Sequence, residues 1–363
     1  MNTFDRDASG LDRRRFLQYL AAGGMAMGLP GLSGAVPAAS QRIRAAAIQM
    51  TPRLGDVEAN LGQAEQLLQE AVRKGAQWIL LPEMFTSAAA FHEDMVTAIR
   101  PLDGAPAKLL HDKAVKHGVT VGGSFLAQEN DRVHNSFLLF LPDGSSYRHD
   151  KDQPTYWEAC YYQDGADDGV LHTPAGDIGV ALCWEMIRSR TVRRLRGKVQ
   201  LLLAGSTWWT LPDAAAVDHP YRKANLEMLQ QAPPRLARLL GVPVIHASHA
   251  GPFSGFDSPE LPDVEYNSHY LGETMICDAE GKQLAHRSMQ QGAGVVLANL
   301  DIPTSPQPLE AVPERFWLPP QMPQEWKDSW TRWLARGEDY YRTVTLPYLD
   351  NGELNEYEPP YLR

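Results

Sequence analysis

Apolar runs alternate with segments of helical periodicity along most of the chain. The first run, RIRAAAIQM at residues 42–50, is typical of a buried strand. In the segment after Asp56, apolar side chains recur at helical spacing as far as Gly75, which stands where a helix C-cap belongs. Further strands are predicted at residues 77–85, 119–127, 133–141, 176–183, 199–206, 242–250 and 294–300. Further helices are predicted at residues 105–116, 187–197 and 217–240. The turn signal PDGS is followed by a strand that ends at about Arg148, and a hairpin is predicted at residues 272–286.

This order of elements predicts the fold class. Strands alternate with helices, as in α/β proteins, but hairpins interrupt the alternation. We therefore expect an α/β domain built on a mixed sheet instead of a uniformly parallel one. Residues 302–363 differ from the rest because they are rich in proline and aromatic residues. Such a segment forms its own core with difficulty, so we expect this C-terminal extension to pack on the body of the domain or on a neighbouring subunit.

The composition is that of an ordinary globular protein, because 44% of the 363 residues are hydrophobic and 21% are charged. The formal net charge of -10 argues against nucleic acid as a partner, since binding a polyphosphate backbone needs a clustered positive face. The arginines between Arg188 and Arg196 are predicted to form a solvated helix face. The histidines lack a metal-binding spacing and no glycine-rich phosphate loop follows a strand, so neither a metal nor a cofactor is expected.

The first forty residues have the layout of a targeting segment. In LDRRRFLQYLAAGGMAMGLPGLSGAVPAAS, a basic stretch precedes a mildly apolar run and then small residues. Arg13 and Arg14 resemble a twin-arginine signal, which implies the twin-arginine export machinery as a partner and a periplasmic or extracellular location. We expect residues 1–39 to be a signal peptide cleaved near Ala39 or Ser40. The alternatives are a basic N-terminal helix and an uncleaved anchor.

The chain has three cysteines, Cys160, Cys183 and Cys277. An odd number leaves at least one thiol unpaired within a chain, so a disulfide framework is not expected. Cys183 ends the apolar run of GVALCWEM, and an aromatic and an acidic residue follow at once. It is either a buried structural thiol, as many free cysteines are, or a nucleophile at the end of a strand.

Two other ionisable residues occupy similar positions. Glu83 lies in LLPEMF and Lys151 in YRHDKDQPTYWE, each near the end of a predicted strand. Taken singly, Glu83 could cap a helix, Lys151 could be a solvated loop charge and Cys183 could be core. Ligands and catalytic groups in open α/β sheets cluster at the carboxyl ends of strands, so the three positions together favour a site.

Several segments, in order, resemble the nitrilase superfamily, the carbon–nitrogen hydrolases. They are AAAIQMTPRLGDVEANL, KGAQWILLPEMF, VHNSFLLFLPDG followed by a lysine, TPAGDIGVALCWE and GETMICDAEGK. The resemblance implies an α-β-β-α sandwich with mixed sheets and a carbon–nitrogen hydrolase domain at residues 40–301. It also implies a catalytic Glu-Lys-Cys arrangement, which falls on Glu83, Lys151 and Cys183.

The resemblance assigns a role to each of these residues. Glu83 would be the general base that takes the thiol proton and later activates water. Lys151 and the backbone N–H of Trp184 would stabilise the oxyanion that forms when Cys183 attacks an amide carbonyl. Glu158 matches a second glutamate that the family often has after the lysine, with a loop acid of no catalytic part as the alternative. Trp208 and Trp209 follow a predicted strand, where they either line the pocket or pack in the core.

The substrate is less closely defined. We expect a small amide or carbamoyl compound, cleaved with release of ammonia or an amine. The first alternative is a nitrilase, since the Cys-Trp-Glu order at Cys183 resembles true nitrilases. The second is a catalytically inactive binding or scaffold member of the family. His246 and His249 either shape specificity or belong to the core. The family tends to pair its subunits, so a homodimer or larger homo-oligomer is expected.

Overall fold

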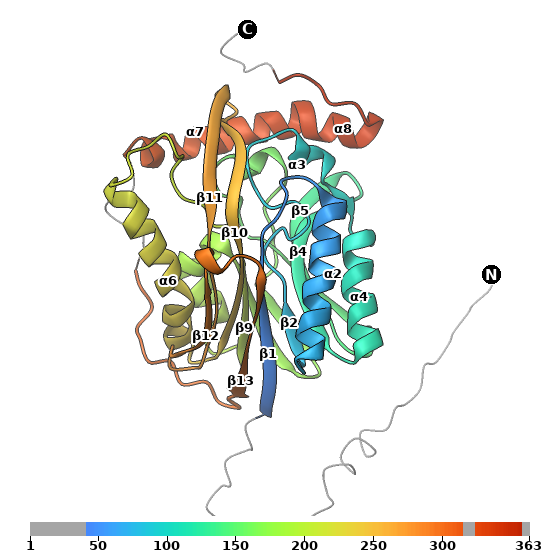
Figure 1. Ribbon diagram of the computed structural model, residues 1–363, viewed down its shortest axis with the longest axis vertical. Helices are drawn as coiled ribbons and strands as arrows, with labels where there is room; N and C mark the ends of the chain where they lie inside the picture. Colours follow the sequence, from blue (N-terminus) through green and yellow to red (C-terminus); the bar gives the residue numbers. More distant parts are fainter. Residues whose placement is uncertain (1–40, 315–323, 358–363) are drawn as a thin grey trace, which may run out of the picture. The chain divides into compact units, whose positions relative to one another are not determined.

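The computed structural model of the protein describes residues 41–314 and 324–357 (Figure 1). The predicted signal peptide, with Arg13 and Arg14, lies outside these ranges. The strands are β1 (Gln41–Met50), β2 (Trp78–Leu80), β3 (Arg100–Pro101), β4 (Thr120–Glu129), β5 (Arg132–Phe140), β6 (Ser146–Asp150), β7 (Val170–Thr173), β8 (Gly176–Leu182), β9 (Leu201–Ser206), β10 (Val244–Ser258), β11 (Leu261–Cys277), β12 (Gln283–Ser288) and β13 (Gly294–Ile302).

Helices and short helical turns connect these strands. They are α2 (Val57–Arg73), α3 (Asp94–Thr97), α4 (Ala105–His117), η1 (Tyr156–Cys160), η2 (Cys183–Ile187), α5 (Ser189–Leu195), α6 (Pro220–Leu240), η3 (Met289–Gln291), α7 (Gln324–Tyr340), η4 (Tyr341–Thr345) and α8 (Leu346–Asn351). Asp56 caps α2 by accepting a hydrogen bond from the backbone N–H of Ala59, as expected for an acidic residue at the start of a helix. Within the two described ranges, none of the helices has the length and apolar composition needed to cross a bilayer.

The strands pair into one mixed sheet, as the hairpins in the sequence predict. Its main path runs β6-β5-β4-β2-β1-β10-β9-β8-β7. Strand β13 pairs antiparallel along the length of β1, while β11 extends the other side of the sheet from β10 and β12 follows β11. The two sides are joined where the carboxyl end of β1 pairs with β10, at Gln49 with Ser248 and Met50 with His249.

Two helical layers enclose two layers of strands, so the predicted α-β-β-α sandwich is confirmed. Alternate side chains of a strand point to opposite faces, and β1 follows this rule. Its Ala45 and Ala47 belong to a core between the two strand layers, which includes Leu201 and Leu203 of β9. Its Ala46 and Ile48 belong to an outer core with apolar residues of α2 and α4 (Figure 1). A third core covers the opposite outer face with residues of α5 and α6.

The structure extends the sequence prediction in two regions. Strands β10 and β11 continue beyond the predicted segments into a long hairpin, paired from Val244–Cys277 out to Ser258–Leu261. Glycine, proline and polar residues dominate this outer part, so it has no apolar run to reveal it. The C-terminal extension forms helices, and α7 packs against η1, so the expectation that it packs on the body of the domain is confirmed for its described residues.

Candidate active site

Glu83, Lys151 and Cys183 all lie at the same end of the sheet. Lys151 comes directly after β6, Cys183 comes directly after β8, and Glu83 follows β2 by three residues. Strands β2, β1, β10, β9 and β8 pair in parallel, so their carboxyl ends share one edge. That edge is where open α/β sheets collect their reactive groups.

The carboxylate of Glu83 is fully buried and held by four polar groups. Its Oε1 lies 2.9 Å from Nζ of Lys151 and accepts a hydrogen bond of 3.0 Å from Nδ2 of Asn135. Its Oε2 accepts hydrogen bonds from the backbone N–H and the hydroxyl of Thr207, at 3.0 and 2.8 Å. Both oxygens therefore have fixed positions, as a general base needs.

Strand β9 can approach Glu83 because it carries a glycine. A Cβ at Gly205 would lie 2.8 Å from the backbone nitrogen of Glu83, closer than real Cβ contacts. With no side chain there, β9 passes directly behind the glutamate and places Thr207 in hydrogen-bonding range. Neither Thr207 nor Asn135 was found from the sequence, because an isolated threonine or asparagine after an apolar run carries no distinctive signal.

Lys151 lies between two carboxylates. Its Nζ is 2.9 Å from Oε1 of Glu83 and 2.7 Å from Oε2 of Glu158, and all three side chains are buried. Burial by itself lowers the pKa of the lysine, but the two carboxylates outweigh it and hold the pKa well above the usual value. Lys151 is therefore a fixed cation. Glu158 also accepts hydrogen bonds from the backbone N–H of Thr155 and the hydroxyl of Tyr162.

Cys183 occupies a strained turn next to this cluster. Its φ angle is +50°, which residues with a Cβ rarely adopt and which is typical of functional sites. Burial raises the pKa of its thiol well above the usual value and the charge of Glu83 adds to the effect, while Lys151 and the backbone N–H of Trp184 work in the opposite direction. Burial also raises the pKa of Glu83, against the effect of Lys151. The resting centre thus holds a protonated thiol beside a carboxylate of increased basicity.

A buried ionic network ties the cysteine turn to the lysine strand. Glu185 accepts hydrogen bonds from the backbone N–H of Leu182, at 2.7 Å, and of Asp152, at 3.0 Å. His149 of β6 lies 3.2 Å from Oε2 of Glu185, and its other ring nitrogen contacts Asp167. Burial by itself lowers the pKa of His149, but the charges of Glu185 and Asp167 raise it to about 9. The imidazolium therefore links β6 to the turn that carries Cys183.

The same network corrects the expectation of a solvated arginine face after Cys183. Arg188 is buried and pairs with Asp152. Arg194 lies 2.6 Å from Oε1 of Glu185 and 2.9 Å from Oδ2 of Asp152, with 11% of its side chain exposed. Arg190 and Arg193 are exposed, as predicted. The spacing of the arginines could not predict these ion pairs, because Asp152, which pairs with both Arg188 and Arg194, lies far from them in sequence.

A narrow aromatic pocket leads to Cys183. Its volume is about 10 Å³, roughly the space that one water molecule requires. The side chain of Asn225 forms hydrogen bonds with two other residues of the pocket. It accepts one from Nε1 of Trp208 and donates one to the carbonyl of Trp209. Trp208 and Trp209, for which pocket lining and core packing were the alternatives, both line this pocket at Cys183. The lining residues are Tyr156, Cys183, Trp184, Trp208, Trp209, Tyr221 and Asn225.

His246 and His249, for which a specificity or core role was open, are both fully buried. Burial lowers the pKa of each to about 4, so both are neutral near pH 7. Nε2 of His249 lies 2.9 Å from the carbonyl oxygen of Glu83, to which the neutral ring donates its proton. His249 therefore supports the backbone of Glu83 from β10, whereas His246 bonds to Ser206 in β9.

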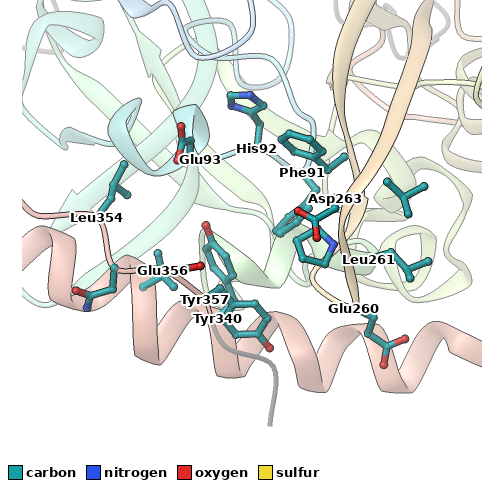
Figure 2. Close-up of a pocket in the computed structure, with 15 residues that line it drawn as sticks. Phe91, His92, Glu93, Glu260, Leu261, Asp263, Tyr340, Leu354, Glu356 and Tyr357 are labelled. Carbon is teal, nitrogen blue, oxygen red and sulfur yellow. The ribbon is translucent and has the colours of Figure 1, made fainter. Parts of the chain in front are cut away.

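A larger pocket of about 820 Å³ lies between α3, the tip of the β10–β11 hairpin and the C-terminal extension. Figure 2 shows carboxylates and aromatic rings around it, among them Glu93, Glu260 and Tyr357. Its described lining does not include Glu83, Lys151 or Cys183, so it is separate from the cysteine centre.

Residues 44–306 match the model of a protein family described as carbon-nitrogen hydrolase. An N-carbamoylputrescine amidase from Arabidopsis thaliana is 35% identical over 141 residues, which are 36% of this chain and 47% of that protein. Nitrilase 3 from Arabidopsis thaliana is 28% identical over 204 residues, 50% of this chain and 58% of that protein. The chain thus spans about half the length of the curated relatives it matches.

A solved structure of a carbon-nitrogen hydrolase from Helicobacter pylori G27 superposes with a TM-score of 0.59 at 18% sequence identity. The superposition covers 85% of this chain and 94% of that one. At this identity the likeness shows a shared fold, in agreement with the sandwich described above.

Proposed function

Since the chain belongs to the carbon–nitrogen hydrolase family, we propose that it is a thiol hydrolase that cleaves a non-peptide C–N bond of a small amide or carbamoyl compound. The observation that carries the proposal is the buried cluster in which Lys151 lies 2.9 Å from Glu83 and 2.7 Å from Glu158, beside the strained turn of Cys183. A cluster with a base, a fixed cation and a thiol has the groups that acyl transfer needs.

In the first half of the reaction, the sulfur of Cys183 attacks the carbonyl carbon while the thiol proton passes to Glu83. The carbonyl oxygen becomes an oxyanion, which Lys151 and the backbone N–H of Trp184 stabilise by roughly 3 kcal/mol per well-placed donor. The C–N bond then breaks, and the proton on Glu83 transfers to the departing nitrogen. Ammonia or an amine leaves, and a thioester remains on Cys183.

In the second half, water attacks the thioester and gives a proton to Glu83. Collapse of the second tetrahedral intermediate breaks the C–S bond, and the proton returns to sulfur. The product is a carboxylic acid, or a carbamic acid that loses carbon dioxide when the substrate is a carbamoyl compound. Glu158 holds Lys151 in place throughout, since its Oε2 is bonded to Nζ.

Two further proposals concern the whole protein. We propose that the N-terminal segment directs export through the twin-arginine machinery to the periplasm or beyond, supported by its arginine pair and small-residue ending. We also propose that the chain forms at least a homodimer, as its family tends to do.

Ammonia release across a panel of aliphatic amides, aromatic amides, carbamoyl compounds and nitriles tests the activity. We expect turnover of amides or carbamoyl compounds, abolished in Cys183→Ala. Cys160→Ala and Cys277→Ala are matched controls, because both thiols are buried and lie outside the cluster, and they should retain activity. Turnover confined to nitriles would replace the amide proposal by the nitrilase alternative. Full activity in Cys183→Ala would refute the mechanism.

A further inference from the structure

Helix α7 of the C-terminal extension packs directly on the segment that forms one side of the Cys183 pocket. The ring of Trp330 lies 4.3 Å from that of Tyr156 and stacks on Trp184 with centroids 5.1 Å apart. The ring of Trp333 lies 5.1 Å from Tyr156 at a steep angle. Two side chains of α7 therefore cover, from outside, two of the aromatic residues that line the pocket.

The close approach of α7 depends on a glycine. A Cβ at Gly337 would lie 2.7 Å from Cβ of Ala159 and 3.1 Å from the backbone nitrogen of Cys160, so only a residue without a side chain fits. The helical turn η4, which follows α7, adds a hydrogen bond, since the hydroxyl of Thr345 donates to the carbonyl of Cys160 at 2.6 Å. The contact between α7 and η1 is thus specific in shape.

Trp330 and Trp333 border two different spaces beside the Cys183 pocket. On one side, Trp330 lines a pocket of about 450 Å³ together with Arg188 and Arg193. On the other, Trp333 lines a small pocket of about 20 Å³ that shares Tyr156 and Trp209 with the Cys183 pocket. Each ring thus borders a second space while it contacts a residue that lines the Cys183 pocket.

We propose that α7 is the outer wall of the substrate pocket and that Trp330 and Trp333 are specificity-determining residues. This inference rests on the proposed function and adds the substrate class that the wall selects. The pocket holds only about 10 Å³ around Cys183, none of its described lining residues carries a formal charge, and two of them, Tyr156 and Trp184, pack against the rings of α7. The wall therefore favours compact, uncharged amide or carbamoyl groups and excludes bulky ones.

Removal of either ring should open the pocket. The test uses the full chain with Trp330→Ala and Trp333→Ala, and Thr331→Ala as the matched control, because Thr331 is exposed on the same helix. The readouts are the rate at which iodoacetamide alkylates Cys183, followed by mass spectrometry, and the ratio of kcat/KM for benzamide to that for acetamide. We expect both to rise roughly tenfold in the tryptophan variants, the discrimination that one apolar contact provides, and to stay unchanged in Thr331→Ala.

A second variant keeps the test decisive if a tryptophan variant folds poorly. Gly337→Ala retains both rings but inserts a methyl group against Ala159, so it should lift α7 and accelerate the labelling of Cys183. Cys277 of β11 is the internal reference, because its labelling reports loosening of the whole fold. Unchanged labelling of Cys183 in all three variants would overturn the proposal, as would parallel acceleration at Cys183 and Cys277.

The labelling and the turnover assays separate the two claims. If the wild-type protein hydrolyses no compound of the panel while Trp330→Ala still accelerates the labelling of Cys183, the proposed function fails and α7 is still the wall of the cysteine pocket. If turnover is found but neither the labelling nor the kcat/KM ratio changes, the wall is refuted and the proposed function stands.

Discussion

The ion pair between His149 and Glu185 predicts how stability depends on pH. Both side chains are fully buried, and the folded protein raises the pKa of His149 from 6.5 to about 9. A group whose pKa is raised on folding contributes stability that is fully present below its unfolded pKa and is lost as pH rises through the folded pKa. The contribution should therefore be complete below pH 6.5 and largely gone at pH 9.

The size of the effect follows from the same two values. The difference between 6.5 and about 9, at 1.36 kcal/mol per pKa unit, corresponds to roughly 3 kcal/mol of unfolding free energy. Solvent screening does not reduce it, because the histidine side chain is 0% exposed. The carboxylates stay ionised across the window, since the pKa of Glu185 is lowered well below its usual value despite the effect of burial, mainly by His149 and Arg194.

Urea unfolding of the wild-type protein and of His149→Gln at pH 6, 7, 8 and 9 measures this contribution. Other groups titrate in this range too, but they are common to both proteins and cancel in the difference. We expect the wild type to be the more stable protein at pH 6 and its advantage to shrink by roughly 3 kcal/mol by pH 9. A difference that stays constant over this range would show that the histidine does not carry the charge assigned to it.

The remaining predictions concern the centre, export and assembly. Activity should rise as the pH passes through the raised pKa of Glu83, because only the ionised carboxylate accepts the thiol proton, and a flat pH profile of the wild-type activity would contradict this role. Glu83→Gln should have no turnover at any pH. Gly205→Ala should push β9 against Glu83 and lower kcat roughly 100-fold at a stability cost of about 1–3 kcal/mol, measured by steady-state kinetics and urea unfolding. Replacing Arg13 and Arg14 by lysine should retain the protein in the cytoplasm, whereas a wild-type protein found there with an intact N-terminus would contradict export. Light scattering should give at least twice the mass of the single chain, which is 40.4 kDa with the N-terminal segment and less after its cleavage, and a monomer would contradict assembly.

The sequence located the candidate residues through two signals together. Glu83 and Cys183 follow apolar runs, so the ends of those strands could be placed. Lys151 follows a largely polar strand, SYRHD, and was assigned by the resemblance to the family. Neither signal indicated Thr207 or Asn135, because a hydrogen bond between residues far apart in sequence leaves no periodic pattern.

The C-terminal extension shows the other limit of sequence reasoning. Its aromatic residues predicted packing on the body of the domain or on a neighbouring subunit, and α7 packs on the body, against η1. The site of packing was not predictable, because it depends on Gly337 meeting Ala159 and on Trp330 meeting Tyr156, contacts of shape between distant segments. The prediction of a solvated arginine face was wrong for Arg188 and Arg194 for a related reason. Helical spacing shows which side chains share a face, but it does not show that buried carboxylates lie opposite that face.

The charges of the centre constrain how the thiol must react. Two carboxylates, Glu83 and Glu158, already surround the single ammonium of Lys151, so the buried cluster carries one net negative charge. Ionising Cys183 in the free enzyme would add a second negative charge to a buried cluster, and burial together with the charge of Glu83 raises the pKa of its thiol. In the proposed mechanism the thiol proton therefore passes to Glu83 as the sulfur attacks. The new negative charge then appears on the substrate oxygen, beside Lys151 and the Trp184 N–H that are proposed to stabilise it.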